Sequence, residues 1–417
     1  MAQIDLKYGS MSLPLEYDPS GFEVLAPDAG RTVLSDAEIG SLLDQPIGSA
    51  TIEDLIEPGA SVLIVVPDAT REVGCGQVIN LVVRRLIATG VNAFDIRIIF
   101  ATGIHRRATD DEKAAIVTPF IAQRIKMLDH DPRDLMQIAG LGRTAAGIPI
   151  EVNRALLDHD HVIVIGGISF HYFAGFTGGR KSICPGLASS RTIAATHKLA
   201  FDCERLARRD GVGPGRLDGN TVNEAFEVVA AAAPPSFAIN TFVDDHGNIN
   251  GLYCGDYRAS HRAACEIYGD ENSIRISEKR STVIVSCGGS PHDLNMIQAH
   301  KALDAAASAC TDGGKIFLFA ECGDGLGRPD FLDWFSAATS GELGARLCEK
   351  YQVNGQTAFS LLQKTERFEV HLVSSLAADT ATKMRFLPAT ADDIIKAARE
   401  SSGYIIPGGA KVKITAC

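Results

Sequence analysis

The sequence predicts an α/β protein of two domains, each with a mostly parallel sheet that is flanked by helices. Short apolar runs alternate with amphipathic segments along most of the chain, which is the pattern expected of alternating strands and helices. A chain of 417 residues is too long for one ordinary hydrophobic core, so more than one domain is expected. Parallel sheets of this kind bind their ligands at the carboxyl ends of the strands, where we look for function.

The first alternating series occupies the N-terminal part of the chain. Residues 61–67 read SVLIVVP, and this continuous apolar run predicts a buried strand. The amphipathic segment 78–88 is followed by Gly90, which is typical of a helix end. Thr109 precedes a run of acidic residues and predicts a helix start. The further strands predicted in this series are 94–100, 162–165 and 237–243, and the further helices are 222–232, 258–268 and one that begins at Ser189 or Ser190.

A second alternating series begins with the apolar strand predicted at 282–286. We therefore expect an N-terminal domain at 1–270 and a C-terminal α/β domain at 271–400. The last segment, 401–417, is a candidate to return to the N-terminal domain. The further strands predicted in the second series are 315–320 and 368–373, and the further helices are 294–307, 331–337, 343–350 and 391–400.

Composition and charge exclude several classes of protein. The net charge of −11 would repel nucleic-acid phosphates and anionic membrane surfaces, so neither is an expected partner. We expect no membrane span, since no run of about 18 apolar residues is present, and no signal peptide. Ten cysteines occur without a C-x-x-C pair, so neither a zinc site nor a disulfide framework is expected. A reducing, cytoplasmic setting is the simplest interpretation.

The stretch 161–198 contains the densest group of reactive side chains. A predicted strand ends in a Gly-Gly pair, a glycine-rich loop follows with His171 and Lys181, and the next predicted helix contains His197. A strand that leads through a glycine loop into a helix directs backbone N–H groups and side chains to one edge of a sheet. Two histidines and a lysine in one short segment therefore indicate a catalytic site.

The order of residues in this loop and after the first predicted strand excludes two nucleotide-binding motifs. A P-loop requires the lysine directly after its second glycine, but here Arg180 separates Gly179 from Lys181. No G-x-G-x-x-G motif follows the first predicted strand, so binding of a free dinucleotide has no support. An ordinary NAD-dependent dehydrogenase is therefore disfavoured.

Other polar residues follow predicted strands. Asp68 and Arg71 come after the first predicted strand, and His105 comes after the second. Gln298 and Lys301 share one face of a predicted helix that follows the strand at the start of the second series. Each residue alone has a plain structural explanation, such as a surface ion pair or a hydrogen-bonded loop histidine. Their occurrence at several strand ends favours one convergent site.

Together these segments resemble the lactate racemase family. The block FHYFAGFTGGRKSICPG, with His197 sixteen residues after Lys181, is highly specific, and the segments DATR and ATGIHR and the pair Gln298 and Lys301 agree with it. The resemblance covers essentially the whole chain. It implies a nickel-dependent racemase or epimerase of 2-hydroxy acids, with its active site in the cleft between two domains. Its cofactor would be the nickel-pincer nucleotide (pyridinium-3,5-bisthiocarboxylic acid mononucleotide nickel).

The resemblance also implies a role for each candidate residue. Lys181 would hold the cofactor covalently as a thioamide. His197 would supply the protein's nitrogen ligand to nickel, which as Ni(II) favours a planar set of donors. His105 and His171 would form the acid/base pair. The remaining implied roles are substrate binding by Arg71, Gln298 and Lys301, and cofactor binding by Asp68, Thr177, Gly178 and Gly179.

The chemistry explains why these residue types are needed. Removing the α hydrogen of a 2-hydroxy acid as a proton would place a second negative charge beside the carboxylate, whereas removing it as a hydride gives a neutral ketone. A histidine can take the hydroxyl proton near neutral pH, and the two enantiomers need one histidine each. An arginine and a lysine suit the substrate carboxylate.

The sequence leaves the substrate open. Lactate racemases of the family have a tryptophan in the substrate pocket, but Trp334 is the only tryptophan here and none lies at 356–361. Lactate, malate, a longer aliphatic acid and an aldonate are the candidates. The alternative function is a hydroxy-acid-binding or cofactor-binding protein without turnover. Cofactor-biosynthesis enzymes would be indirect partners, and no oligomeric state is predicted.

Overall fold

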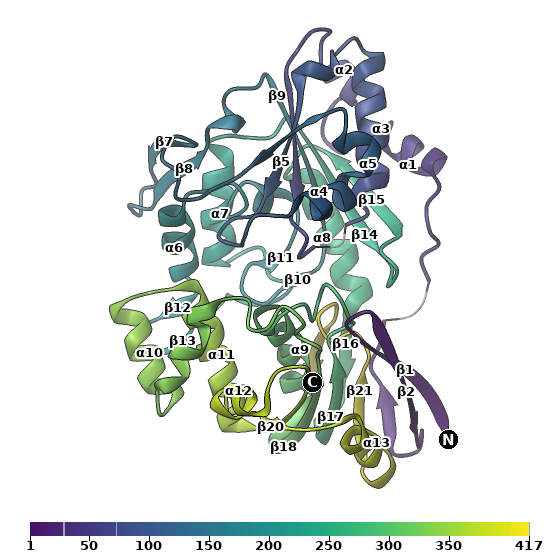
Figure 1. The fold of residues 1–417 in the computed structure, drawn as a ribbon, viewed down its shortest axis with the longest axis vertical. Helices are drawn as coiled ribbons and strands as arrows, with labels where there is room; N and C mark the ends of the chain where they lie inside the picture. Colours follow the sequence, from purple (N-terminus) through teal and green to yellow (C-terminus); the bar gives the residue numbers. More distant parts are fainter. Residues whose placement is uncertain (28–29, 72, 417) are drawn as a thin grey trace. The chain divides into compact units, whose positions relative to one another are not determined.

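The computed structural model describes residues 1–27, 30–71 and 73–416. Contacts divide the chain into two compact units (Figure 1). Unit 1 consists of Met1–Ala29, Phe201–Arg209 and Gly269–Cys417, and unit 2 consists of Gly30–Ala200 and Asp210–Tyr268. Among the described residues, no helix has the length and apolar character that a membrane span requires.

Unit 2 is built around a six-stranded sheet in the order β15-β14-β9-β4-β5-β6. All neighbours pair in parallel except the edge strand β15, which is antiparallel to β14. The central strand β4 is an unbroken apolar run because both faces of the sheet are covered. The strands are β4 (Val62–Pro67), β5 (Ile96–Ala101), β6 (Lys126–Asp129), β9 (His161–Gly167), β14 (Phe237–Val243) and β15 (Ile249–Gly255).

The two faces of this sheet have different covers. On one face, Ile64 and Val66 of β4 point into a core that they share with Val82 of α3. The opposite face receives the glycine-rich loop, whose short helix η3 contacts β4, β9, β14 and α7. The helices of unit 2 are α1 (Asp36–Leu43), α2 (Ile52–Leu55), α3 (Cys75–Ala88), η1 (Ala93–Asp95), α4 (Asp110–Val117), α5 (Pro119–Ala122), η2 (Arg154–Leu156), η3 (Gly179–Ser182), α6 (Ser190–Lys198), α7 (Thr221–Ala231) and α8 (Ala259–Asn272). The last residues of α8 belong to unit 1. The small hairpins of unit 2 are β7 (Ile138–Arg143) with β8 (Pro149–Asn153) and β10 (Phe170–His171) with β11 (Gly175–Phe176).

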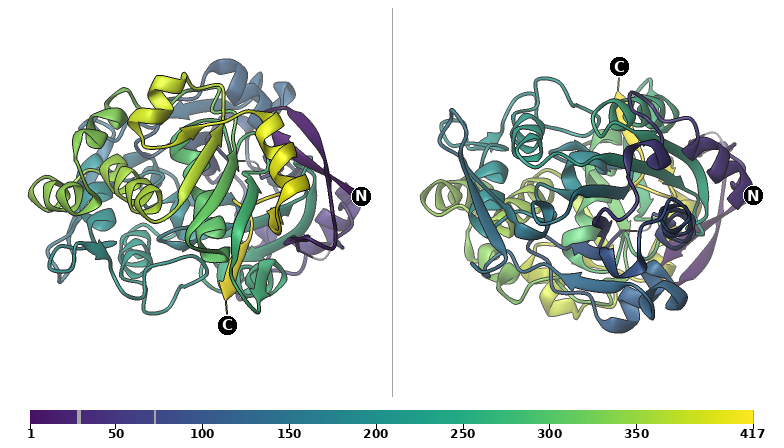
Figure 2. Two further views of the ribbon diagram at one scale, coloured as in Figure 1. Left: turned by 90° about the horizontal axis from the view of Figure 1, so that it is seen from below. Right: turned by 90° about the horizontal axis from the view of Figure 1, so that it is seen from above.

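Unit 1 contains a second six-stranded sheet in the order β20-β19-β18-β17-β21-β3, and all its neighbours pair in parallel. Alternate residues face two cores: Val283 and Val285 pack with α9 and α11, whereas Ile284 packs with the N-terminal hairpin and α13. Figure 2 (left) shows this sheet between the light-green helices and the purple hairpin. Its strands are β3 (Phe22–Val24), β17 (Arg280–Ser286), β18 (Cys310–Phe319), β19 (Glu369–Val373), β20 (Leu387–Pro388) and β21 (Gly403–Ile406).

The remaining elements of unit 1 lie around this sheet. They are the hairpin β1 (Ala2–Tyr8) with β2 (Met11–Tyr17), the pairs β12 (Phe201–Asp202) with β13 (Ala207–Arg208) and β16 (Ser273–Ile276) with β22 (Lys413–Ala416), and the helices α9 (Met296–Ala309), η4 (Pro329–Ser336), α10 (Ser340–Glu349), α11 (Val353–Arg367), α12 (Ala378–Lys383) and α13 (Ala391–Glu400).

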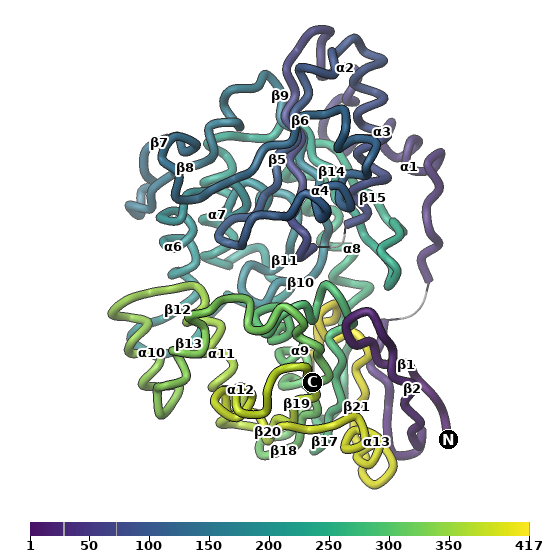
Figure 3. Tube along the Cα trace, in the orientation of Figure 1, coloured from purple at the N-terminus to yellow at the C-terminus, as the bar shows by residue number. Residues whose placement is uncertain are grey.

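The predicted fold class, two α/β domains with mostly parallel sheets, is confirmed. The division of the chain differs from the predicted domains of 1–270 and 271–400. In unit 1, β3 pairs with β21 (Figure 3, purple beside yellow), and β22 pairs with β16. Segment 401–417, the candidate to return to the N-terminal domain, thus belongs with the C-terminal sheet. These are backbone pairings between distant segments, which leave no local signal in the sequence.

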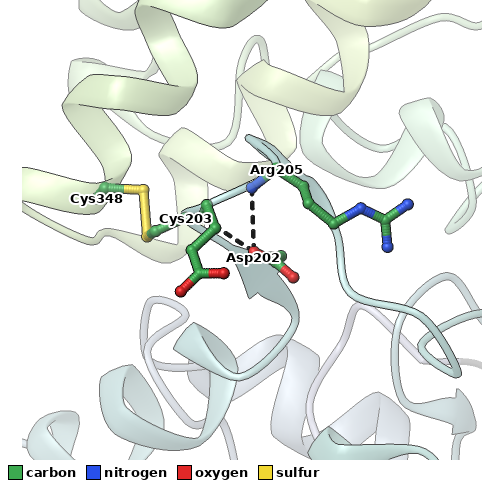
Figure 4. Close-up of a disulfide and its surroundings, with 5 residues drawn as sticks. Asp202, Cys203, Arg205 and Cys348 are labelled. Atoms are coloured by element: carbon green, nitrogen blue, oxygen red, sulfur yellow. Dashed lines mark hydrogen bonds between the residues drawn. A yellow bond between two sulfur atoms is a disulfide. The ribbon is translucent and has the colours of Figure 1, made fainter.

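One disulfide, which the sequence analysis did not predict, joins Cys203 to Cys348 in unit 1 (Figure 4). The two cysteines are 145 residues apart, so no local motif identifies the pair. Cys203 lies in the turn between β12 and β13, where Asp202 accepts a hydrogen bond of 3.2 Å from the backbone N–H of Arg205. The disulfide joins this turn to α10. The sequence predicted no disulfide framework and a reducing setting. This pair is an exception to that expectation, and the other described cysteines are buried thiols.

Two buried histidines predict how the stability of the fold depends on pH. Burial lowers the pKa of His130 in unit 2 to about 4 and the pKa of His300 in unit 1 to about 3. In the unfolded chain each titrates near its ordinary value of about 6.5. Between these values the unfolded state binds more protons. The free energy of unfolding should therefore fall as the pH falls below about 6.5, by about 1 kcal/mol per histidine and pH unit.

Urea unfolding near pH 7 and at about pH 5 measures this dependence. The variant His130→Gln should reduce this dependence by the share of one histidine, whereas His246→Gln, at an exposed position, should leave it unchanged. An unfolding free energy that is equal at the two pH values would contradict the prediction.

Candidate active site

Asp68 and His105 form a hydrogen-bonded pair at the ends of two neighbouring strands. Asp68 follows β4 and His105 lies in the loop after β5, and these strands pair in parallel up to their last residues. Nδ1 of His105 lies 2.7 Å from Oδ2 of Asp68. The other carboxylate oxygen accepts from the backbone N–H and the hydroxyl of Thr70, at 3.1 and 2.6 Å. This network orients the carboxylate and, through it, the imidazole ring.

The partners of Asp68 keep its carboxyl group ionised. Burial raises the pKa of this carboxyl, but the charge and hydrogen bond of His105, the hydroxyl of Thr70 and the charge of Arg71 outweigh burial and bring the pKa to about 2. Asp68 is therefore ionised at neutral pH and accepts the Nδ1 hydrogen of His105. In the neutral ring this leaves Nε2 as the nitrogen that can accept a proton.

The glycines of the loop after β9 are required by close packing. A Cβ on Gly166 would lie 3.1 Å from the Cα of Gly178, because the loop folds back onto the strand. Gly179 has φ of +49°, and a Cβ there would lie 2.7 Å from the ring of His261. Its N–H already donates to Oδ1 of Asn240, at 3.2 Å. The contacts of these glycines described here are with other residues of unit 2. The predicted binding of the cofactor by Gly178 and Gly179 stays a prediction.

Thr177 joins the two ends of this loop. Its hydroxyl donates to the carbonyl of Gly167 at 2.6 Å and accepts from the N–H of Ser169 at 2.8 Å. These bonds use the hydroxyl hydrogen and one acceptor position of the oxygen. The predicted contact of Thr177 with the cofactor therefore also stays a prediction.

A phenylalanine ring lies between two of the predicted histidines. Phe173 is edge-on to His171, with ring centroids 4.7 Å apart, and edge-on to His197, with centroids 5.1 Å apart. Nδ1 of His171 accepts from the N–H of Ala174 at 3.2 Å. Nδ1 of His197 donates to the carbonyl of Ile193 at 2.8 Å. The latter bond leaves Nε2 of His197 as the nitrogen suited to a ligand.

A second phenylalanine joins His197 to Lys181. The ring of Phe226 on α7 lies 5.4 Å from the ring of His197, and Nζ of Lys181 lies 5.2 Å from the centroid of Phe226. The structure thus brings His171, Lys181 and His197 together, as the sequence predicted. Neither phenylalanine was predicted from the sequence. Phe173 lies in the aromatic run FHYF, which is a usable signal, but Phe226 has the pattern of any core residue on a helix.

The environment of His197 keeps it neutral. Burial, followed by the charge of Lys181, lowers its pKa to about 3. A neutral imidazole is the form that binds a metal ion. Within the described ranges, no group of three or more His, Cys, Asp and Glu side chains is placed to hold a metal ion. A metal at His197 would therefore take its other donors from a non-protein group, and this fits a nucleotide that brings its own sulfur and carbon donors.

The helix that contains His197 is fixed at its N-terminus. Ser189 caps α6 by accepting from the N–H of Thr192 at 3.1 Å, and its hydroxyl donates to Glu151 of β8 at 2.6 Å. Arg191 on the same helix also donates to Glu151, from Nε at 3.1 Å. This network ties the helix to the hairpin β7–β8, which the sequence analysis did not predict.

Gln298 and Lys301 lie in unit 1, on α9, and their side chains are hydrogen-bonded to each other. Asn295 caps this helix by accepting from the N–H of Gln298 at 3.0 Å. The prediction that the two residues share one helix face is confirmed. Their predicted role in substrate binding stays a prediction, as do the roles of Arg71 and of the residues in unit 2.

Comparison with known proteins identifies the family. The models of the lactate racemase N-terminal domain and the lactate racemase C-terminal domain match residues 8–208 and 276–412. The chain is 30% identical to the lactate racemase of Thermoanaerobacterium thermosaccharolyticum, over 80% of this chain and 78% of that protein. It is 31% identical to the lactate racemase of Lactiplantibacillus plantarum, over 79% of this chain and 77% of that protein.

Solved structures agree with this match. The lactate racemase apoprotein of Thermoanaerobacterium thermosaccharolyticum has a TM-score of 0.87 and 26% identity, covering 99% of this chain and 100% of that chain. A protein from Thermotoga maritima has the same fold, with a TM-score of 0.72 and 21% identity, covering 93% of this chain and 100% of that chain. The chain is therefore an enzyme of the isomerase class. It belongs to the lactate racemase family.

Proposed function

We propose that this enzyme racemises or epimerises a 2-hydroxy acid by reversible hydride transfer, with a nickel-pincer nucleotide as cofactor. Lys181 and His197 hold the cofactor, and two other histidines serve as acid and base. The grouping of His171, Lys181 and His197 around two buried phenylalanine rings is the observation that supports this most. When bound, the nucleotide would supply an electrophilic carbon suited to hydride chemistry, with Lys181 and His197 as the residues that would hold it.

His105 takes the hydroxyl proton of one enantiomer. Its Nδ1 hydrogen bond to the ionised Asp68 fixes the tautomer in which Nε2 is the basic nitrogen. When Nε2 takes the proton, the ring becomes an imidazolium, and the carboxylate 2.7 Å away stabilises its charge. Asp68 thus acts through His105, as its orienting group.

His171 serves the other enantiomer. The N–H of Ala174 donates to its Nδ1, so in the neutral ring the hydrogen is on Nε2, which can donate to the substrate oxygen. The two histidines are therefore held in opposite tautomers by their partners. To take and return the hydroxyl proton of its enantiomer, His171 uses Nδ1, the nitrogen with the lone pair in the neutral ring, in exchange for the hydrogen bond from Ala174.

Arg71 and Lys301 bind the substrate carboxylate, and Gln298 orients Lys301. The side-chain hydrogen bond between Gln298 and Lys301 supports this assignment on the side of unit 1. On the side of unit 2, the charge of Asp68 partly offsets the effect of burial on the pKa of Arg71, so the guanidinium stays charged. In this proposal each unit contributes one cation that binds the substrate carboxylate.

Lactate is the first substrate to test, because the relatives are lactate racemases. Malate, a longer aliphatic acid and an aldonate are the alternatives. Trp334 is a core residue of unit 1 that packs against Gly355, so it serves as packing and the substrate-lining tryptophan of the family has no counterpart at 356–361. We further propose that separate cofactor-biosynthesis enzymes load the chain in the cytoplasm.

Variants of the two histidines test the acid/base assignment. His105→Ala and His171→Ala should each lower turnover of the best 2-hydroxy acid by about 10²–10⁴-fold, the usual contribution of a positioned acid or base. Chiral chromatography of the product over time measures this. The exposed His246→Ala is the control and should turn over normally. Wild-type turnover by both variants would rule out the assignment.

Intact mass and nickel content test the cofactor assignment. Protein produced together with the cofactor-making enzymes should show a mass increase that matches the nucleotide and about one nickel per chain. Lys181→Ala should lose the covalent mass increase, whereas Lys198→Ala, an exposed lysine on α6, should keep it. A mass increase that survives in Lys181→Ala would place the linkage elsewhere.

A further inference from the structure

Arg180 is the most completely buried large side chain in the glycine-rich loop, with 0% of its surface exposed. It stands between Gly179 and Lys181, and its position there means that the loop does not match a P-loop motif. Its guanidinium donates to three backbone carbonyls of the same loop. These are the carbonyls of Ala174 at 2.9 Å, Phe176 at 3.2 Å and Gly178 at 3.4 Å.

Two helices supply the other acceptors. Nε donates to Oδ1 of Asn223 on α7 at 2.7 Å, and Nη1 donates to Nε2 of His261 on α8 at 2.8 Å. The nearest carboxylate oxygen, of Glu227, lies 3.6 Å from Nε. Asn223 is itself held by the carbonyl of Leu217, which lies outside the loop, at 3.0 Å. Nε2 of His261 also lies 2.9 Å from the carbonyl of Thr177 in the loop.

A fully buried guanidinium is stable only when nearly all its donors have acceptors. Each loop carbonyl that turns toward Arg180 fixes the orientation of one peptide plane. The three carbonyls belong to alternate residues between His171 and Lys181, so the path of the loop between these two residues is set by a single cation. His171 is the first residue of this loop and Lys181 is the last.

We propose that Arg180 is a positioning residue, whose guanidinium is the internal template around which residues 171–181 fold. It determines where the imidazole of His171 and the amine of Lys181 are presented. The catalytic meaning of this geometry rests on the proposed function, whereas the folding of the loop around Arg180 does not.

Chemical rescue tests the proposal on the chain without cofactor. Arg180→Ala removes the atoms of N-ethylguanidinium, so this small molecule is the matched probe and ethylammonium is its control. Hydrogen exchange should become at least about tenfold faster at three amides of the loop. The N–H groups of Phe176 and Lys181 donate to carbonyls within the loop, and the N–H of Thr177 donates to the carbonyl of Ser169 just before it. Millimolar N-ethylguanidinium should restore their protection, and ethylammonium should not.

Cofactor attachment gives a second measurement, other than the activity of the loaded enzyme. On incubation with purified cofactor, Arg180→Ala should form the mass adduct at least about tenfold more slowly than wild type, with recovery in N-ethylguanidinium. Arg85→Ala is the matched control. Arg85 is a half-buried arginine of unit 2 that donates to the carbonyl of Gly40 at 2.8 Å, far along the chain from this loop, and its loss should leave attachment unchanged.

The outcomes are distinguishable. Wild-type exchange and wild-type attachment in Arg180→Ala would overturn the proposal, and so would recovery with ethylammonium as well as with N-ethylguanidinium. If wild type forms no adduct, the proposed function fails, but the exchange measurement still decides the role of Arg180. If Arg180→Ala does not fold, Asn223→Ala removes a single acceptor, and it should raise exchange at the same amides without unfolding unit 2.

Discussion

Parallel pairing of β5, β4 and β9 is the constraint on which the candidate site depends. Pro67 at the end of β4 pairs with Ala101 at the end of β5, and β9 pairs with the other edge of β4. Because the three strands run in one direction, the loops after them leave the sheet at one edge. These loops contain Asp68, His105 and the whole glycine-rich segment, so the sheet sets their separation before any side chain is considered.

Asp68, His197 and Arg180 have hydrogen-bond partners, and these partners fix their orientations. Asp68 is ionised against His105 and Thr70, His197 is neutral and hydrogen-bonded through Nδ1, and Arg180 is surrounded by carbonyls. Leaving such groups unpaired in the interior would cost several kcal/mol each, so their alternative orientations are suppressed. Rigid placement of this kind is what hydride and proton transfer between fixed groups requires.

The sequence was informative where the cause of a feature is local. The apolar run at 61–67 predicted β4, and His105 stood out because it directly follows a strand. Features that depend on distant segments were not predictable. Phe226 and Arg180 acquire their roles only when α7 and α8 pack against the loop, and the Cys203–Cys348 disulfide joins residues that no spacing relates. The strand pairings that place the N-terminal segment in unit 1 are missed for the same reason.

The central claim is that the α hydrogen leaves and returns as a hydride while histidines handle the hydroxyl proton. The most direct test follows a deuterium at the α carbon of an accepted 2-hydroxy acid during racemisation in ordinary water. Retention of deuterium in both product forms is predicted, because a hydride that stays within the site does not mix with solvent protons. Loss of deuterium to water at the rate of racemisation would show proton abstraction and contradict the account.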